Sequence, residues 1–158
     1  MEKLGFEKNK RLVRDFNNVP TQIWLGGGHY SFKSKFEAKW AKYLQLLKDS
    51  GEIIEWYYEP HTFYFPNEKT APVQYTPDFL VIENDDTEIY QETKGYHDGP
   101  TNSKLRRFAR HYPDEIIELV LMRMPKKGKS ANRIRVANKY VRRIIDASVI
   151  FKQIGEQK

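Results

Sequence analysis

Segments with helical spacing of apolar residues alternate along this chain with short segments of strand type, and this order most limits the folds open to it. The strand-type segments are rich in β-branched and aromatic residues and are bounded by glycine, proline or acidic turns. The helical segments are 34–50, 103–112 and 131–154, and the strand-type segments are 52–58, 61–65, 73–82, 87–94 and 116–122. This order predicts a mixed β-sheet flanked by helices, which is the α/β class.

The 158 residues have room for one domain with short appended segments. We expect an N-terminal arm over 1–28, containing a short strand at 21–25 and a glycine turn at 26–28. The core of the domain is expected over 29–125. A basic C-terminal helix is expected over 126–158.

Two absences narrow the function classes. No apolar run approaches the roughly 20 residues that a membrane-spanning helix needs, so we expect no membrane contact. Cysteine is absent, which excludes a disulfide scaffold, a thiolate zinc site and a cysteine nucleophile. The lack of cysteine is also typical of a reducing compartment, and the predicted location is therefore the cytoplasm.

Positive charge is concentrated in one part of the chain. The sequence has 27 basic and 21 acidic residues, and residues 104–143 contain thirteen of the basic residues but only three acidic ones. Such a bias favours a polyanionic partner such as nucleic acid, although a merely solvated basic surface is the alternative.

Two acidic residues interrupt strands that are otherwise apolar or aromatic. Asp78 lies within 73–82, and Glu92 lies near the end of 87–94. On adjacent antiparallel strands the two carboxylates can approach each other, and they repel unless a divalent cation such as Mg²⁺ or Mn²⁺ lies between them. Lys94 is two residues from Glu92 and therefore lies on the same strand face. Together these groups suit phosphodiester hydrolysis, although Glu92 and Lys94 also fit an exposed cross-strand charge pattern.

The sequences YTPDFL at 75–80 and ETKG at 92–95 resemble the PD-(D/E)XK nuclease superfamily, which has the restriction-endonuclease-like fold. More closely, they resemble the phage endonuclease I family that resolves Holliday junctions. The segment from SKFEA at 34–38 to GEI at 51–53 also resembles a related phage family of poorly assigned function. The similarity is densest over 75–113 and fades beyond 125.

The resemblance implies a role for each matching residue. Asp78 and Glu92 would be metal ligands, together with the backbone carbonyl of Thr93, and Lys94 would be the catalytic lysine. Glu37 would complete the metal site, although it also stands at capping-box spacing from Ser34. The implied cofactor is Mg²⁺, with Mn²⁺ able to substitute. The spacing of fourteen residues between Asp78 and Glu92 is longer than in the phage resolvase.

The resemblance also implies that the protein is a homodimer and that its substrate is branched DNA. It implies further that the protein is encoded by a phage and acts in a bacterial host. Basic residues in two groups are expected to contact the DNA backbone, with a solvated face as the alternative. These residues are Lys104, Arg106, Arg107 and Arg110 in the first group, and Lys126, Lys127, Lys129, Arg133 and Arg135 in the second.

The favoured hypothesis is a metal-dependent DNA endonuclease that cuts Holliday junctions. One alternative is a sequence-specific or nicking endonuclease of the homing or restriction type. Another is a nucleic-acid-binding member of the fold that has no catalytic activity.

Overall fold

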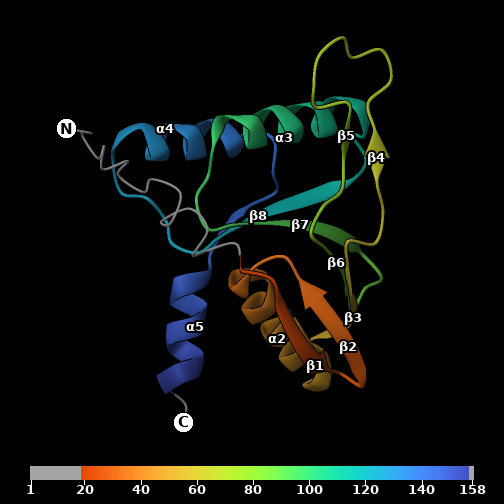
Figure 1. The fold of residues 1–158 in the computed structure, drawn as a ribbon, viewed down its shortest axis with the longest axis vertical. Helices are drawn as coiled ribbons and strands as arrows, with labels where there is room; N and C mark the ends of the chain where they lie inside the picture. The colour runs from red at the N-terminus through yellow and green to blue at the C-terminus, as the bar shows by residue number, and fades with distance from the viewer. Residues whose placement is uncertain (1–18, 157–158) are drawn as a thin grey trace, which may run out of the picture.

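A five-stranded mixed sheet lies at the centre of the molecule and separates the helices into two layers (Figure 1). The computed structural model describes residues 19–156. The strands of this sheet, in spatial order, are β3 (Ile53–Tyr58), β6 (Phe79–Glu83), β7 (Glu88–Lys94), β8 (Ile116–Leu121) and β9 (Ile144–Asp146). The pairs β3–β6 and β6–β7 are antiparallel, whereas β7–β8 and β8–β9 are parallel. The predicted α/β class is confirmed, and the arrangement is compatible with a restriction-endonuclease-like fold.

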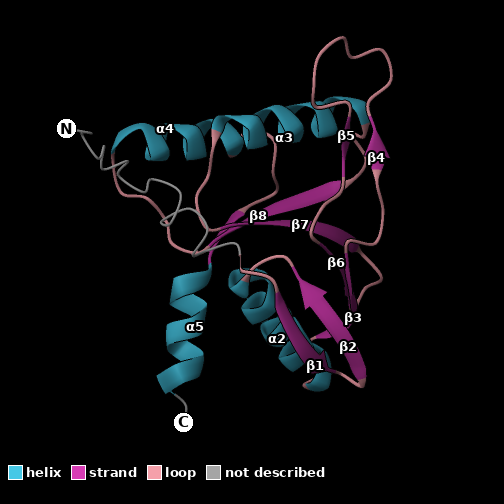
Figure 2. Ribbon diagram, viewed as in Figure 1, coloured by secondary structure: helices cyan, strands magenta, loops and turns pink. Residues whose placement is uncertain are grey.

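The helices cover both faces of the sheet (Figure 2). Helices α3 (Gly99–His111) and α4 (Gly128–Ala137) lie on one face, and α2 (Lys35–Asp49) and α5 (Ala147–Glu156) lie on the other. Successive residues of a strand point to opposite faces, so each face has its own apolar core. Within residues 19–156, no helix is long and apolar enough to span a membrane.

The first described elements form a hairpin beside α2. Strands β1 (Thr21–Leu25) and β2 (Gly28–Phe32) pair through a tight turn, in which Gly26 and Gly27 have φ angles of 57° and 81°. Positive φ angles of this kind favour glycine, so the predicted strand and glycine turn are confirmed. Residues 21–28 of the predicted arm belong to this hairpin, which contacts α2, and residues 1–18 lie outside the described part.

The strand predicted over 73–82 is interrupted. It forms β5 (Gln74–Tyr75), which pairs with β4 (Phe63–Tyr64), and then β6. The break falls at Pro77, because proline has no N–H for a strand ladder and restricts the residue before it. As a result Asp78 lies directly before β6 rather than in the middle of a strand.

The long basic C-terminal helix predicted over 131–154 is wrong. The segment folds as α4, then β9, then α5. Ile144 and Ile145 pair with Leu119 and Val120 of β8, because β-branched residues suit a strand and the edge of β8 offers unpaired backbone groups. Helix α5 then begins after Asp146, whose carboxylate accepts a hydrogen bond from the backbone N–H of Ser148.

Candidate active site

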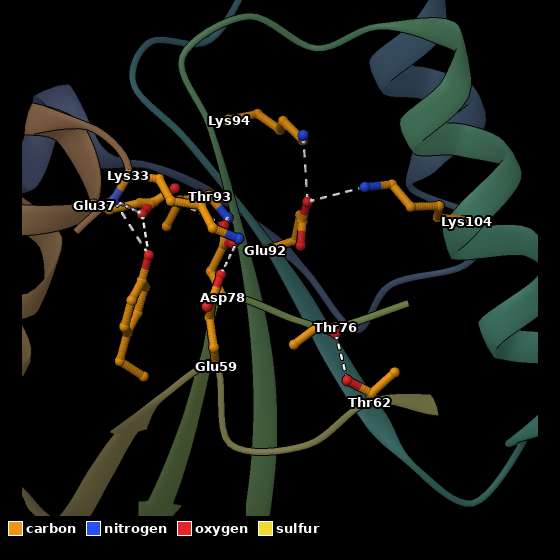
Figure 3. A network of polar contacts seen from close by, with 11 residues as sticks. Lys33, Glu37, Glu59, Thr62, Thr76, Asp78, Glu92, Thr93, Lys94 and Lys104 are labelled. Atoms are coloured by element: carbon orange, nitrogen blue, oxygen red, sulfur yellow. Dashed lines mark hydrogen bonds and ion pairs between the residues drawn. The ribbon is translucent and has the colours of Figure 1, made fainter. Parts of the chain in front are cut away.

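The predicted catalytic residues line one open cavity of about 720 Å³ where β6 begins and β7 ends (Figure 3). Asp78 precedes β6, while Glu92 and Lys94 lie at the end of β7. Glu37 reaches the same cavity from the first turn of α2. The turn between β6 and β7 and the start of α2 therefore bring together residues that are far apart in the sequence.

Asp78 is held by the neighbouring strand. Its Oδ2 accepts hydrogen bonds from the backbone N–H of Thr93 at 2.8 Å and from the Thr93 hydroxyl at 2.7 Å. Burial, and then the charge of Glu92, raise the pKa of Asp78 to about 8, against the opposing effect of the Thr93 hydrogen bonds. Asp78 is thus a carboxyl whose charged form is unfavourable in the absence of a cation.

Glu92 is almost fully buried and each of its oxygens has a different environment. Oε2 accepts a 2.7 Å hydrogen bond from the hydroxyl of Tyr75. Oε1 lies 3.4 Å from Nζ of Lys94 and 3.8 Å from Nζ of Lys104. The predicted placement of Glu92 and Lys94 on one strand face is confirmed by this ion pair (Figure 3).

Glu37 combines a helix-capping position with a place in the site. Its backbone N–H donates to the hydroxyl of Ser34 at 3.1 Å, so Ser34 is the N-cap as the sequence predicts. Its carboxylate accepts hydrogen bonds from the hydroxyl of Tyr58 at 2.6 Å and from the backbone N–H of Lys33 at 3.0 Å. The carboxylate is therefore oriented by two donors outside the helix.

The donor set fits a hydrated divalent cation. In the described part of the chain, no three His, Cys, Asp or Glu side chains lie close enough together to enclose a metal ion. Mg²⁺, however, keeps several waters and is usually bound through only one or two carboxylates. Asp78 and Glu92 each have one oxygen anchored by the protein, which is how hydrogen bonds orient metal ligands. Thr93 uses its N–H and hydroxyl to hold Asp78, and the metal contact of its carbonyl stays a prediction.

The neighbouring carboxylates keep the side chain of Lys94 positively charged. Burial alone would lower the pKa of Lys94, but the carboxylates of Glu92 and Asp78 outweigh burial and raise it above 10.5. Lys94 is therefore an ammonium group at neutral pH. Such a group can stabilise negative charge on a phosphate but cannot accept a proton from water.

The basic residues of α3 divide into three environments. Lys104 points into the cavity, with Nζ 5.3 Å from the centre of the Tyr75 ring. Arg106 and Arg110 are exposed, and Arg110 pairs with Glu68. The structure corrects the prediction for Arg107, which is only 8% exposed and donates to the carbonyls of Thr70 and Pro72. Its guanidinium holds the loop between β4 and β5.

The second basic group surrounds the start of α4. Arg133 is half-buried and donates a 3.1 Å hydrogen bond to the hydroxyl of Tyr96, which lines the cavity. The remaining members of this group are exposed: Lys126, Lys127, Lys129 and Arg135. Their contact with DNA stays a prediction.

Sequence reasoning missed four residues that shape the site: Lys33, Tyr58, Glu59 and Tyr75. Tyr75 opens the YTPDFL segment, so its place in that segment was an available signal. Tyr58 ends β3, Glu59 lies between that strand and Pro60, and Lys33 precedes the helix N-cap. Nothing in their spacing connects these three residues to Asp78 or Glu37.

Comparison with known proteins identifies one family. The family model described as a protein of unknown function (DUF1064) matches residues 24–140. That span begins within β1, ends just beyond α4, and includes Glu37, Asp78, Glu92 and Lys94. No significant match is found among curated proteins or among solved structures.

Proposed function

The chain belongs to the DUF1064 family, and we propose that it is a metal-dependent endonuclease that hydrolyses phosphodiester bonds in DNA. One observation supports this proposal above the others. Asp78 and Glu92, with one oxygen each anchored by a hydrogen bond, share an open cavity with the ammonium group of Lys94. Carboxylates suited to Mg²⁺ or Mn²⁺ beside a fixed cation are the groups that phosphoryl hydrolysis needs.

Each side chain has a distinct part in the proposed reaction. Asp78 and Glu92 would hold the cation, with Glu37 as a further acidic residue of the site. A bound Mg²⁺ would polarise the phosphate and lower the pKa of a bound water. Lys94 neutralises charge that develops on the phosphate, since its own pKa is raised rather than lowered.

Branched DNA is the proposed substrate, with a homodimer cutting two strands of a four-way junction. Lys104, which lines the cavity, and the exposed basic residues on α3 and before and within α4 support a polyanionic substrate. The preference for a junction over a linear duplex, and the dimer, rest on the resemblance to the phage resolvases.

The deciding experiment compares a synthetic four-way junction with its matched linear duplex, in Mg²⁺ and in a chelator. Symmetric, Mg²⁺-dependent cuts near the branch point of the junction alone are the expected result. Equal cutting of both substrates would keep the nuclease and discard the junction preference. Tight binding without cutting in Mg²⁺ or Mn²⁺ would instead favour a non-catalytic DNA-binding protein.

Two variants test the site assignment. Asp78→Asn and Lys94→Ala should each lower the cutting rate by about a thousandfold or more while leaving DNA binding measurable. Lys42→Ala is the control, because Lys42 is an exposed lysine of α2 that does not line the cavity. Cutting at the normal rate by either site variant would overturn the assignment.

A further inference from the structure

An ion pair joins Lys33, which lines the proposed active-site cavity, to Glu59. Nζ of Lys33 contacts Oε1 of Glu59, and Lys33 lines the same cavity as the catalytic residues (Figure 3). Glu37 and Asp78 also act on Lys33 electrostatically. Lys33 is therefore a third lysine of the cavity, beside Lys94 and Lys104, and its partner is a carboxylate that no part of the proposed mechanism uses.

The two partners differ in how firmly they are held. Glu59 has a φ angle of 44°, a left-handed conformation that is unfavourable for a residue with a side chain. Its backbone N–H donates a 2.7 Å hydrogen bond to the carbonyl of Asp78, which ties Glu59 to the site. The side chain of Lys33 is 69% exposed and flexible. The Glu59 side chain is 28% exposed, so Lys33 has the greater freedom to move when the pair separates.

A nucleic-acid phosphate can compete for Lys33. An exposed ion pair contributes only about 0–1 kcal/mol. A lysine that binds a DNA phosphate gains from the release of counterions as well as from the contact. The carboxylates of the cavity also repel a phosphate, so a cation at this position offsets a real electrostatic cost.

We propose that Lys33 binds a phosphate of the substrate, and that in the free protein Lys33 is paired with Glu59 and leaves this partner for the phosphate when DNA enters. This inference rests on the proposed function and adds to it a phosphate-binding residue and an ion pair that weakens binding of DNA to the free protein. Lys33 and Glu59 therefore act in opposite directions on the same binding step.

Fluorescence anisotropy of labelled DNA over a range of salt concentrations tests the proposal, in EDTA so that a metal-dependent enzyme leaves the DNA uncut. Lys33→Ala should weaken binding about threefold to tenfold and lower the slope of log affinity against log salt by about 1. Lys33→Arg should retain most of the affinity. Glu59→Gln should tighten binding at least about twofold, and the two effects should be coupled in a double-mutant cycle.

The matched control is again Lys42→Ala, which changes the net charge by the same amount outside the cavity. Thermal unfolding of each variant shows whether the fold is retained. Wild-type salt dependence in Lys33→Ala, or weaker binding in Glu59→Gln, would overturn the inference. If the unaltered protein cuts DNA and all variants bind alike, only this inference fails; if the unaltered protein neither binds DNA nor cuts it in Mg²⁺, the proposed function fails with it.

Discussion

The hydroxyl of Tyr75 donates a 2.7 Å hydrogen bond to Oε2 of Glu92, and both side chains are at least 96% buried. The Tyr75 ring packs edge-on against Phe108 of α3, with ring centres 5.8 Å apart. Strand β5 and helix α3 thus fix the tyrosine, and the tyrosine decides which oxygen of Glu92 is left for Lys94. Tyr75 therefore orients a proposed metal ligand, although the proposed reaction gives Tyr75 no chemical step.

Tyr75→Phe should therefore weaken the site without changing its charge. The substitution removes one hydroxyl and leaves a buried carboxylate oxygen without its donor, which costs about 1–3 kcal/mol of folding free energy. Loss of such an orienting hydrogen bond lowers metal affinity or activity about tenfold to a hundredfold. Mg²⁺ titration of DNA cutting, together with urea unfolding, measures both effects.

Tyr112→Phe is the matched control for Tyr75→Phe. Tyr112 packs against Phe108 as well, but its hydroxyl donates to the carbonyl of Tyr64, away from the carboxylates. It should lose some stability and keep its metal dependence. An unchanged Mg²⁺ dependence in both variants would contradict the orienting role of Tyr75.

The raised pKa of Asp78 makes the stability of the metal-free protein depend on pH. Its pKa rises from 3.8 to about 8 on folding, so the folded protein binds the proton more tightly than the unfolded chain. The contribution of Asp78 to the free energy of unfolding therefore falls as the pH rises from about 4 to about 8, and then levels off. An asparagine at this position cannot ionise, so the free energy of unfolding of Asp78→Asn should lack this decrease with pH.

Asp78→Asn should consequently be more stable than the unaltered protein by about 1–3 kcal/mol at pH 9, while it loses activity. The difference should shrink steadily as the pH is lowered toward 4. Urea unfolding in EDTA at several pH values checks this trend. If Asp78→Asn is as stable as the unaltered protein at every pH, or less stable at pH 9, then ionisation of Asp78 costs no folding free energy.

Arg106 and Arg107 are adjacent on α3 and should respond in opposite ways. Arg107→Ala leaves the carbonyls of Thr70 and Pro72 without their donor and leaves Glu68 with one fewer cationic partner. We expect a loss of about 2–4 kcal/mol in folding free energy. Arg106→Ala should change stability by less than about 0.5 kcal/mol and weaken DNA binding.

Unfolding curves and anisotropy, measured on both variants, separate the two roles. A stable Arg107→Ala protein with weakened DNA binding would reverse this assignment. The neighbouring pair also shows why charge alone does not identify a DNA-binding residue.

Local signals predicted the parts of the site that depend on local geometry. The Ser34 cap follows from capping chemistry, and the shared face of Glu92 and Lys94 follows from the two-residue period of a strand. Tyr58 and Tyr75 could not be predicted in the same way. They reach Glu37 and Glu92 from 21 and 17 residues away, and only the packed sheet brings these pairs together.

The C-terminal region shows how tertiary contacts override a periodic pattern. Ile134, Ala137, Val141, Ile144 and Ile145 have helical spacing. The last two nevertheless form β9, because the edge of β8 accepts a parallel strand there. Arg142 and Arg143, which contribute to the basic excess of residues 104–143, both form ion pairs with Glu118.

Glu118 should therefore be essential for the docking of β9. Its carboxylate is fully buried and accepts hydrogen bonds at 2.9 Å from Nε of both Arg142 and Arg143, and one at 3.1 Å from Gln91. Glu118→Ala removes the acceptor that Arg142, Arg143 and Gln91 share, and because both guanidinium groups stay partly solvated and Arg142 keeps Glu83, we expect a cost of about 1–3 kcal/mol.

Hydrogen exchange localises this effect, because the N–H of Arg142 donates to the carbonyl of Ile117 and the N–H of Leu119 donates to that of Arg143. Both amides should exchange faster in Glu118→Ala, while the amides of β6 change less. Glu115→Ala, an exposed change near the start of β8, is the control and should leave exchange unaltered. Unchanged protection at Arg142 and Leu119 would mean that backbone pairing and the isoleucines hold β9 without the ion pairs.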